Sequence, residues 1–169
     1  RRICVYHYYN IPANKYVTSM NRLLIKNATL VNEDRQQQAD VLIVNQRIEK
    51  IAADIPHDGQ AQLIDATGLH LFPGMIDDQV HFREPGLTHK GTLASESRAA
   101  VAGGTTSFME MPNTMPQTTT IEALEHKYAL GAEKSLANYS FYMGATNTNL
   151  DELRKVDPEK VCGVKVFMG

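Results

Sequence analysis

The feature that most constrains the fold is an alternation of strand-like and helix-like stretches that runs from Pro73-Gly74 to residue 169. Strands alternating with helices join into a parallel sheet that carries its helices outside. The pattern therefore predicts an α/β unit. The expected strands are MIDDQVHF, TTSFMEM, YSFYMGAT and GVKVFMG, and the expected helices are TLASESRAAVAGG, TTIEALEHKYALGA and NLDELRKV.

Two architectures fit this alternation, a closed (β/α)8 barrel and an open doubly wound sheet. A dinucleotide-binding sheet would carry G-x-G-x-x-G after its first strand, and that motif is absent. Active residues of a barrel lie at the carboxyl ends of its strands. In this chain, polar residues lie at the expected strand ends: Gln79, His81 and Arg83 at the first strand, Asn113 at the second and Asn147 after the third. Their placement favours the first part of a TIM-type (β/α)8 barrel.

The segment before this alternation is rich in short β-like runs separated by polar turns. LLIKNATLV and DVLIVNQRIEKIA are parted by the polar NEDRQQQA, and Asn45-Gln46 is expected to form a hairpin turn. The chain ends in an apolar strand pattern, so we expect a fragment of a longer protein. The expected regions are an extraneous or disordered leader at 1–20, an N-terminal β-sandwich part at 21–73 and a truncated first half of the barrel at 74–169.

Composition excludes several classes of protein. The net charge of −2 argues against non-specific nucleic-acid binding, which needs a basic surface. No apolar stretch approaches the roughly 20 residues of a membrane span. Cys4 and Cys162 are far apart and fit no zinc or redox spacing. We therefore expect a cytoplasmic protein that binds neither nucleic acid nor membrane.

Gln79 and His81 are candidates for one metal site. Alternate residues of a strand point to the same side, so these two, with Arg83 beyond them, can converge at a barrel mouth. Two histidines at this spacing would give a metal two nitrogen ligands. Only His81 carries an imidazole, because Gln79 offers a neutral amide oxygen, a weaker donor for zinc. On this pattern alone, a metal ligand and a hydrogen-bonded core histidine are equally open for His81.

Lys165, Arg83 and Asn113 each allow more than one role. Lys165 lies in an apolar strand, where it would be an amine of depressed pKa, a carbamate formed with CO2 or an edge residue facing water. The spacing alone favours the edge residue. Arg83 suits a substrate carboxylate, and the amide of Asn113 can help to hold an anionic or amide substrate. The alternatives are a surface salt bridge for Arg83 and a turn for Asn113.

A long segment, LFPGMIDDQVHFREPGLTHKGTLASESRAAVAGGTTSFMEMPNTMP, resembles the N-terminal signature of dihydroorotases of the cyclic amidohydrolase superfamily. HFREPG and MPNT are its most specific parts, and GVKVFMG resembles the family's fourth-strand segment. The resemblance implies a metal-dependent (β/α)8 barrel with a β-sandwich built from both chain ends. It also implies that further metal ligands and the catalytic aspartate belong to later strands, so no catalytic residue lies within this chain, and the chain alone is expected to be inactive.

The resemblance assigns roles residue by residue. His81 matches the second histidine of the family's metal pair, and Lys165 matches a lysine that is carboxylated and bridges two metals in many members. Arg83 and Asn113 match the residues that grip the substrate carboxylate. Gln79 departs from the pattern, because it stands where the first metal-binding histidine is usual. The implied cofactor is one or two Zn²⁺ ions, and the whole protein is expected to be a homo-oligomer.

For the whole protein the resemblance implies reversible hydrolysis of the cyclic amide of dihydroorotate to N-carbamoyl-aspartate, a reaction of pyrimidine biosynthesis. Two other readings stay open. One is a different cyclic amidohydrolase, such as a hydantoinase, dihydropyrimidinase or allantoinase, whose substrates mostly lack the ring carboxylate. The other is a non-catalytic amidohydrolase-like scaffold subunit, a reading that Gln79 favours and that the presence of His81, Arg83, Asn113 and Lys165 opposes.

Overall fold

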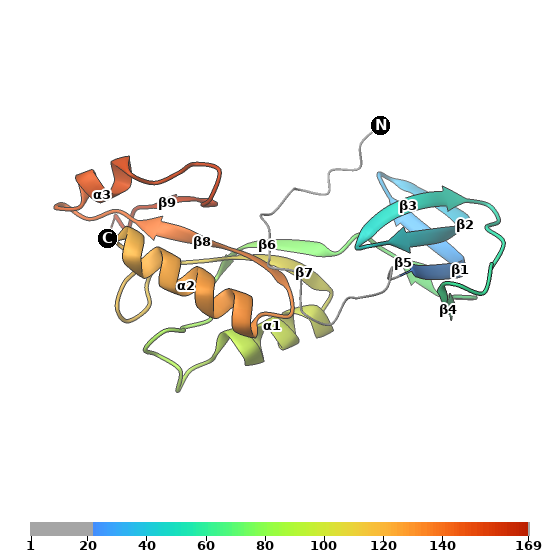
Figure 1. The fold of residues 1–169 in the computed structure, drawn as a ribbon, viewed down its shortest axis with the longest axis horizontal. Helices are drawn as coiled ribbons and strands as arrows, with labels where there is room; N and C mark the ends of the chain where they lie inside the picture. The colour runs from blue at the N-terminus through green and yellow to red at the C-terminus, as the bar shows by residue number, and fades with distance from the viewer. Residues whose placement is uncertain (1–21, 169) are drawn as a thin grey trace. The chain divides into compact units, whose positions relative to one another are not determined.

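The computed structural model describes residues 22–168, which form two compact units that divide after Pro73 (Figure 1). The leader expected at 1–20 lies outside the described residues. Within the described part of the chain, none of the helices is long and apolar enough to cross a membrane.

The first unit is a five-stranded, mixed sheet in which β1 is central. β2 pairs with β1 and β3 with β2 in antiparallel hairpins, while β4 and β5 both pair with β1 in parallel. Asn45 and Gln46 form the β2–β3 turn with φ of 50° and 68°, which confirms the predicted hairpin. The strands are β1 (Arg22–Asn32), β2 (Arg35–Val44), β3 (Arg47–Ala52), β4 (Gln62–Asp65) and β5 (His70–Leu71).

The polar stretch NEDRQQQA is not a separator, contrary to expectation. Only Glu33 and Asp34 form a turn, and residues 35–38 are already part of β2. These polar residues are exposed, yet they pair in register with β1, where Asn32 lies opposite Arg35. Because the hydrogen-bonded ladder of a hairpin uses only the backbone, the strand continues into water beyond the part that buries side chains.

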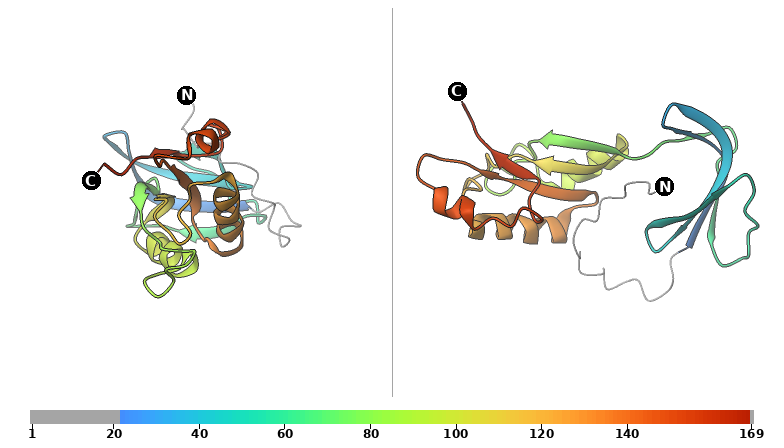
Figure 2. Two further views of the ribbon diagram at one scale, coloured as in Figure 1. Left: turned by 90° about the vertical axis from the view of Figure 1, so that its left-hand side faces the viewer. Right: turned by 90° about the horizontal axis from the view of Figure 1, so that it is seen from above.

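The second unit is a curled parallel sheet whose strand order, β6-β7-β8-β9, follows the chain. Helix α1 packs on β7 and α2 packs on β8, and the two helices also touch each other (Figures 1 and 2). This arrangement is the one that the strand–helix alternation predicts. The elements are β6 (Met75–Val80), α1 (Leu93–Ala102), β7 (Thr105–Glu110), α2 (Ile121–Lys134), β8 (Asn138–Gly144), α3 (Leu150–Arg154) and β9 (Gly163–Lys165).

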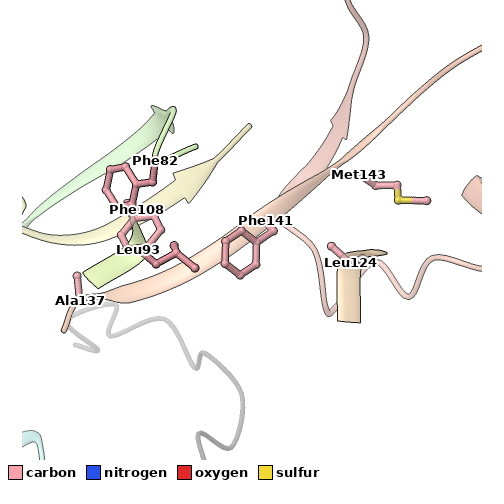
Figure 3. Packing of buried hydrophobic residues seen from close by; sticks show 7 residues of the cluster. All are labelled: Phe82, Leu93, Phe108, Leu124, Ala137, Phe141 and Met143. Carbon is pink, nitrogen blue, oxygen red and sulfur yellow. The ribbon is translucent and has the colours of Figure 1, made fainter. Parts of the chain in front are cut away.

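A hydrophobic core fills the space between this sheet and its helices (Figure 3). The rings of Phe82 and Phe108 pack at a tilt of 44° with centroids 4.4 Å apart, and Phe141 of β8 is fully buried in the same cluster. Aromatic side chains dominate such cores because each removes a large apolar area from water. The cluster consists of Phe82, Leu93, Phe108, Leu124, Ala137, Phe141 and Met143.

Helical periodicity predicts that Leu93, Ala100 and Val101 share the inner face of α1, and the structure confirms this only in part. Leu93 is fully buried and Ala100 packs against the core, but Val101 is 42% exposed. A helix turns about 100° per residue, so a side chain seven positions after Leu93 returns to its face, whereas one eight positions later has rotated away. The helix ends at Ala102 with Gly103 as its C-cap, as the Gly-Gly pair predicts.

For α2 the sequence predicts a capping box at Thr119 and Glu122 and an inner face of Ile121, Leu124, Tyr128 and Ala132. The cap and one of these inner residues differ from that prediction. The N-cap is Thr120 rather than Thr119, and its hydroxyl accepts a hydrogen bond from the backbone N–H of Ala123 at 3.2 Å. Ala132 is exposed, and Lys127 lies on the buried face instead. Its aliphatic stem fits an apolar stripe, while its charge finds a buried partner described below.

The stretch NLDELRKV predicts Asn149 as the N-cap of α3. Asn149 occupies that position, but its side chain does not cap the helix. The amide nitrogen donates to the carbonyl oxygens of Thr119 and Gly144 at 2.8 Å and 2.9 Å. The amide oxygen accepts from the backbone N–H of Thr146 at 2.8 Å. Asn149 therefore fixes the loop after β8 against the start of α2, and α3 begins without a side-chain cap.

Candidate active site

Two predicted site residues meet where β6 and β7 end. His81 follows the last residue of β6, and Asn113 lies three positions after β7. The Nδ1 atom of His81 lies 2.9 Å from the Oδ1 atom of Asn113, in hydrogen-bond contact. With the amide oxygen as acceptor, Nδ1 carries the proton and the lone pair is left on Nε2. The exposed imidazole of His81 is thus oriented by Asn113 and offers Nε2 to a ligand.

The loops that carry these residues are bound to each other through their backbones. The N–H of Met111 donates to the carbonyl oxygen of Val80 at 3.0 Å, and the N–H of Met115 donates to that of Pro85 at 3.0 Å. The β6–α1 loop and the β7–α2 loop therefore form one layer at the carboxyl edge of the sheet. Catalytic groups of barrel enzymes lie at this edge.

Arg83 combines a fixed backbone with a side chain that has no partner in the described part of the chain. Its φ of 74° places it in the left-handed region, which is uncommon for a residue other than glycine. Its N–H donates to the Oε1 atom of Glu110 at 3.0 Å, and its carbonyl accepts from Leu87 at 3.0 Å. Across residues 22–168, no side chain or carbonyl pairs with its half-buried guanidinium. The guanidinium is therefore available to an anion.

Glu84 has a structural role that the sequence did not suggest. It is buried, and its Oε2 atom accepts the N–H of Leu93 at 2.8 Å at the start of α1. Its Oε1 atom lies 2.5 Å from the Nζ atom of Lys134 at the end of α2. The carboxylate joins two helix ends to the loop that carries Arg83, and a carboxylate is favoured at a helix N-terminus by the helix dipole.

Glu110 and Lys127 form a fully buried ion pair beneath this layer. The Nζ atom of Lys127 lies 2.9 Å from the Oε2 atom of Glu110, and the side chains are 1% and 0% exposed. Burial raises the pKa of Glu110 and lowers the pKa of Lys127, because each charged form loses its hydration. Sequence reasoning missed the pair, although a signal was present: Glu110 ends an apolar strand, and Lys127 is three residues after Leu124 on the inner stripe.

The remaining predicted residues, Lys165 and Gln79, lie on the outer strands of the sheet. Lys165 ends β9 and pairs in register with Gly144 of β8, and its Nζ atom lies 5.4 Å from the ring centroid of Phe167. Gln79 is exposed in β6. Among the described side chains, His81 forms a hydrogen bond with Asn113 and with neither of these two. Their roles at a metal stay predictions.

The donor set for a metal is partial. In residues 22–168, no three side chains of His, Cys, Asp or Glu come close enough together to hold a metal ion. Zinc accepts an imidazole such as that of His81, and a protein site supplies three or four ligands. The described residues can therefore provide only part of a zinc site.

Comparison with known proteins gives the family. Residues 68–166 match the family described as Dihydro-orotase-like. The allantoinase of Deinococcus radiodurans is 42% identical over 147 residues, which cover 86% of this chain and 33% of that protein. The dihydroorotase of Streptococcus pyogenes is 42% identical over 120 residues, which cover 70% of this chain and 28% of that protein. The chain spans about a third of the length of the curated relatives it matches.

Solved structures show the same fold. L-hydantoinase from Arthrobacter aurescens superposes with a TM-score of 0.79 at 30% identity, covering 86% of this chain and 32% of that one. A crystal structure of D-hydantoinase gives 0.74 at 31% identity, covering 88% and 33%. The curled sheet β6–β9 is thus part of a TIM-type barrel, which confirms the predicted fold class. This chain belongs to the Dihydro-orotase-like family of cyclic amidohydrolases.

Proposed function

We propose that the whole protein hydrolyses the cyclic amide of dihydroorotate, reversibly with N-carbamoyl-aspartate, and that Arg83 and Asn113 bind the substrate carboxylate. The observation that carries this proposal is the Arg83 guanidinium, which has no partner within residues 22–168 although its backbone is held at both N–H and carbonyl. A guanidinium presents a rigid fork of donors that matches a carboxylate. A dihydroorotase is among the relatives.

Asn113 complements this guanidinium. Its Oδ1 atom is taken by His81, and no acceptor within the described residues pairs with its Nδ2 group. The two residues therefore present donors, the arrangement that an anionic group requires. Holding the carboxylate at this point would fix the ring and keep its scissile amide in one orientation, which lowers the entropic part of the barrier.

His81 and Lys165 are the proposed zinc ligands of this chain, with Gln79 as a weaker third. His81 would bind through Nε2, and Lys165 as an amine or as its carbamate, while the other ligands belong to residues beyond those described. When bound, the metal supplies an activated water and polarises the scissile carbonyl. The hydrogen bond from Nδ1 of His81 to Asn113 would keep the imidazole in the tautomer that zinc needs.

Allantoin is the second candidate substrate, because the allantoinase relative matches more of the chain at the same identity. The decisive experiment measures kcat/KM of the whole protein for dihydroorotate, allantoin, hydantoin and dihydrouracil. Dihydroorotate is expected to be the preferred substrate. A preference for allantoin or hydantoin would overturn the assignment.

A variant of Arg83 tests the same assignment at one residue. Arg83→Ala is expected to raise the KM for dihydroorotate by about 10- to 100-fold, the range for losing a charged hydrogen-bonding partner. Arg83→Lys should recover part of the loss, because it keeps the charge without the fork. Arg98→Ala removes the same charge from an exposed position of α1 and should leave KM unchanged. An unchanged KM in Arg83→Ala would refute the role of Arg83.

A further inference from the structure

The buried pair Glu110–Lys127 contacts the backbones of both loops that carry the proposed substrate-binding residues. One oxygen of Glu110 accepts the N–H of Arg83 at 3.0 Å, while the other lies 2.9 Å from the Nζ atom of Lys127. The same Nζ atom donates to the carbonyl of Met111 at 3.2 Å. Met111 is two residues before Asn113, so one ion pair contacts the backbone of Arg83 itself and the backbone two residues before Asn113.

On the Glu110 side, the contact fixes an uncommon backbone conformation. Arg83 has a φ of 74°, which costs free energy in a residue with a side chain. The acceptor beneath its N–H is a carboxylate that is 0% exposed, and a charge-assisted hydrogen bond of this kind is stronger than one between neutral groups. The bond therefore helps to hold Arg83 in the backbone conformation in which its guanidinium has no partner among residues 22–168.

On the Lys127 side, the ammonium is enclosed. Its Nζ atom lies 4.8 Å from the ring centroid of Phe141, and the residue is 1% exposed. Besides contacting Glu110, this Nζ atom donates to the carbonyl oxygen of Met111, at the start of the segment that turns through Asn113. Lys127 therefore joins α2 to the backbone of that segment by a hydrogen bond.

We infer that Glu110 and Lys127 form a positioning pair that sets the backbone of Arg83 and Asn113 for substrate binding. The pair does not touch the substrate, and the inference rests on the proposed function of those two residues. Stability alone does not require such a pair, since apolar residues of similar volume often replace a buried ion pair without loss. What an apolar replacement cannot supply is the acceptor for Arg83 and the donor for Met111.

Two double variants of the whole protein isolate the acceptor. Glu110→Met with Lys127→Met removes both charges and both contacts. Glu110→Gln with Lys127→Met also removes both charges but keeps a carbonyl oxygen for the N–H of Arg83. The first variant is expected to have a KM for dihydroorotate about tenfold above that of the second, the cost of an unsatisfied buried N–H, at similar kcat. Equal KM values in two folded variants would overturn the positioning role.

A double-mutant cycle with Arg83→Ala shows whether the ion pair changes KM through Arg83. In that background the two double variants should have the same KM within about twofold, because the residue being positioned has lost its side chain. A tenfold difference that persists would mean that the pair acts on the fold in general, and would overturn the inference. A protein whose KM ignores Arg83→Ala refutes the proposed function. A protein that responds to Arg83→Ala but not to the pair refutes the positioning role alone.

A matched control separates positioning from loss of stability. Lys26 and Asp40 form a comparable ion pair in the first unit, with Nζ and Oδ2 2.6 Å apart and Asp40 buried. Lys26→Met should lower Tm without changing KM. If Glu110→Met with Lys127→Met fails to fold, Glu110→Gln with Lys127→Met is compared with wild type. Its KM should rise, and the rise should vanish in an Asn113→Ala background. An unchanged KM in that comparison overturns the role of Lys127.

Discussion

Gly86 lies so close to the backbone of Met115 that a Cβ atom added to the glycine would overlap the carbonyl oxygen. Gly86 also has a φ of 83°, in the left-handed region. The β6–α1 and β7–α2 loops meet at this contact, beside the hydrogen bond from Met115 to Pro85. The glycine of HFREPG is thus required because a second backbone occupies the space of a side chain.

Gly86→Ala is expected to push the two loops apart. Gly104→Ala is the matched control, because Gly104 lies in the same unit with a φ of 90° and nothing within 4 Å of its added Cβ. The control should lose about 1 kcal/mol from the backbone conformation alone. Gly86→Ala should lose about 2 kcal/mol more because of the overlap, measured as the free energy of unfolding in urea. Equal losses in the two variants would contradict the close contact.

The course of the chain through the second unit could be predicted from the sequence because periodicity is a local property. Alternation and helical stripes identify the strands and helices without knowledge of their partners. Faces were harder. Val101 and Ala132 are exposed although they are apolar, since small shifts in rotation around a helix axis decide which side chains meet the sheet.

The site was predictable only where a motif is contiguous. His81 and Asn113 were each identified, but not their hydrogen bond, because it depends on how two loops dock. The pair of Glu110 and Lys127 was missed for the same reason: each is a charged residue in an apolar pattern, and only the packing of α2 on the sheet brings them together. The left-handed backbone of Arg83 likewise has no marker in its residue type.

Acid should weaken the first unit through Asp40. Burial disfavours the ionised form of this carboxylate, but hydrogen bonds from Lys26 and from the N–H groups of Asn27 and Ile55 outweigh burial and hold its pKa below the usual value. A carboxylate with a lowered folded pKa stabilises the protein above its unfolded pKa of about 4, and that contribution is lost as the pH falls through the folded pKa.

The measurement is Tm against pH for wild type and Asp40→Asn. The variant is expected to melt at a lower temperature than wild type at pH 7, and the difference should shrink as the pH falls below about 4. The side chain of Asp151 is 89% exposed, so Asp151→Asn should have the same Tm as wild type at pH 7 and at pH 3. A difference for Asp40→Asn that stays constant from pH 7 to pH 3 would contradict the ionised, hydrogen-bonded state.

Cys162 is expected to be unreactive in the native protein. Burial raises the pKa of its thiol to about 11, so the reactive thiolate is scarce near neutral pH. In a Cys4→Ser background, disulfide exchange with an aromatic disulfide reagent at pH 8 should be about 100-fold slower than after unfolding in urea. The native rate should rise as the pH increases from 8 to 10. Rapid stoichiometric labelling at pH 8 would contradict the half-buried position and the raised pKa of this thiol.

Metal content tests whether the whole protein is a hydrolase or a scaffold. The whole protein is expected to contain zinc, and chelation should abolish hydrolysis until zinc is restored. His81→Ala should lower the zinc content measured by mass spectrometry. His126→Ala removes an exposed histidine from α2 and should leave that content unchanged.

Gln79→His sharpens the same test, because it adds an imidazole two residues from His81, at the position where the sequence resemblance predicts another metal-binding histidine. Imidazole is a better zinc ligand than a neutral amide, so the variant should bind zinc more tightly, or bind more of it, than wild type does. Measuring zinc occupancy against a competing chelator resolves the two cases. A zinc-free whole protein that still oligomerises, and whose zinc content does not respond to Gln79→His, would favour the scaffold and exclude His81 as a ligand.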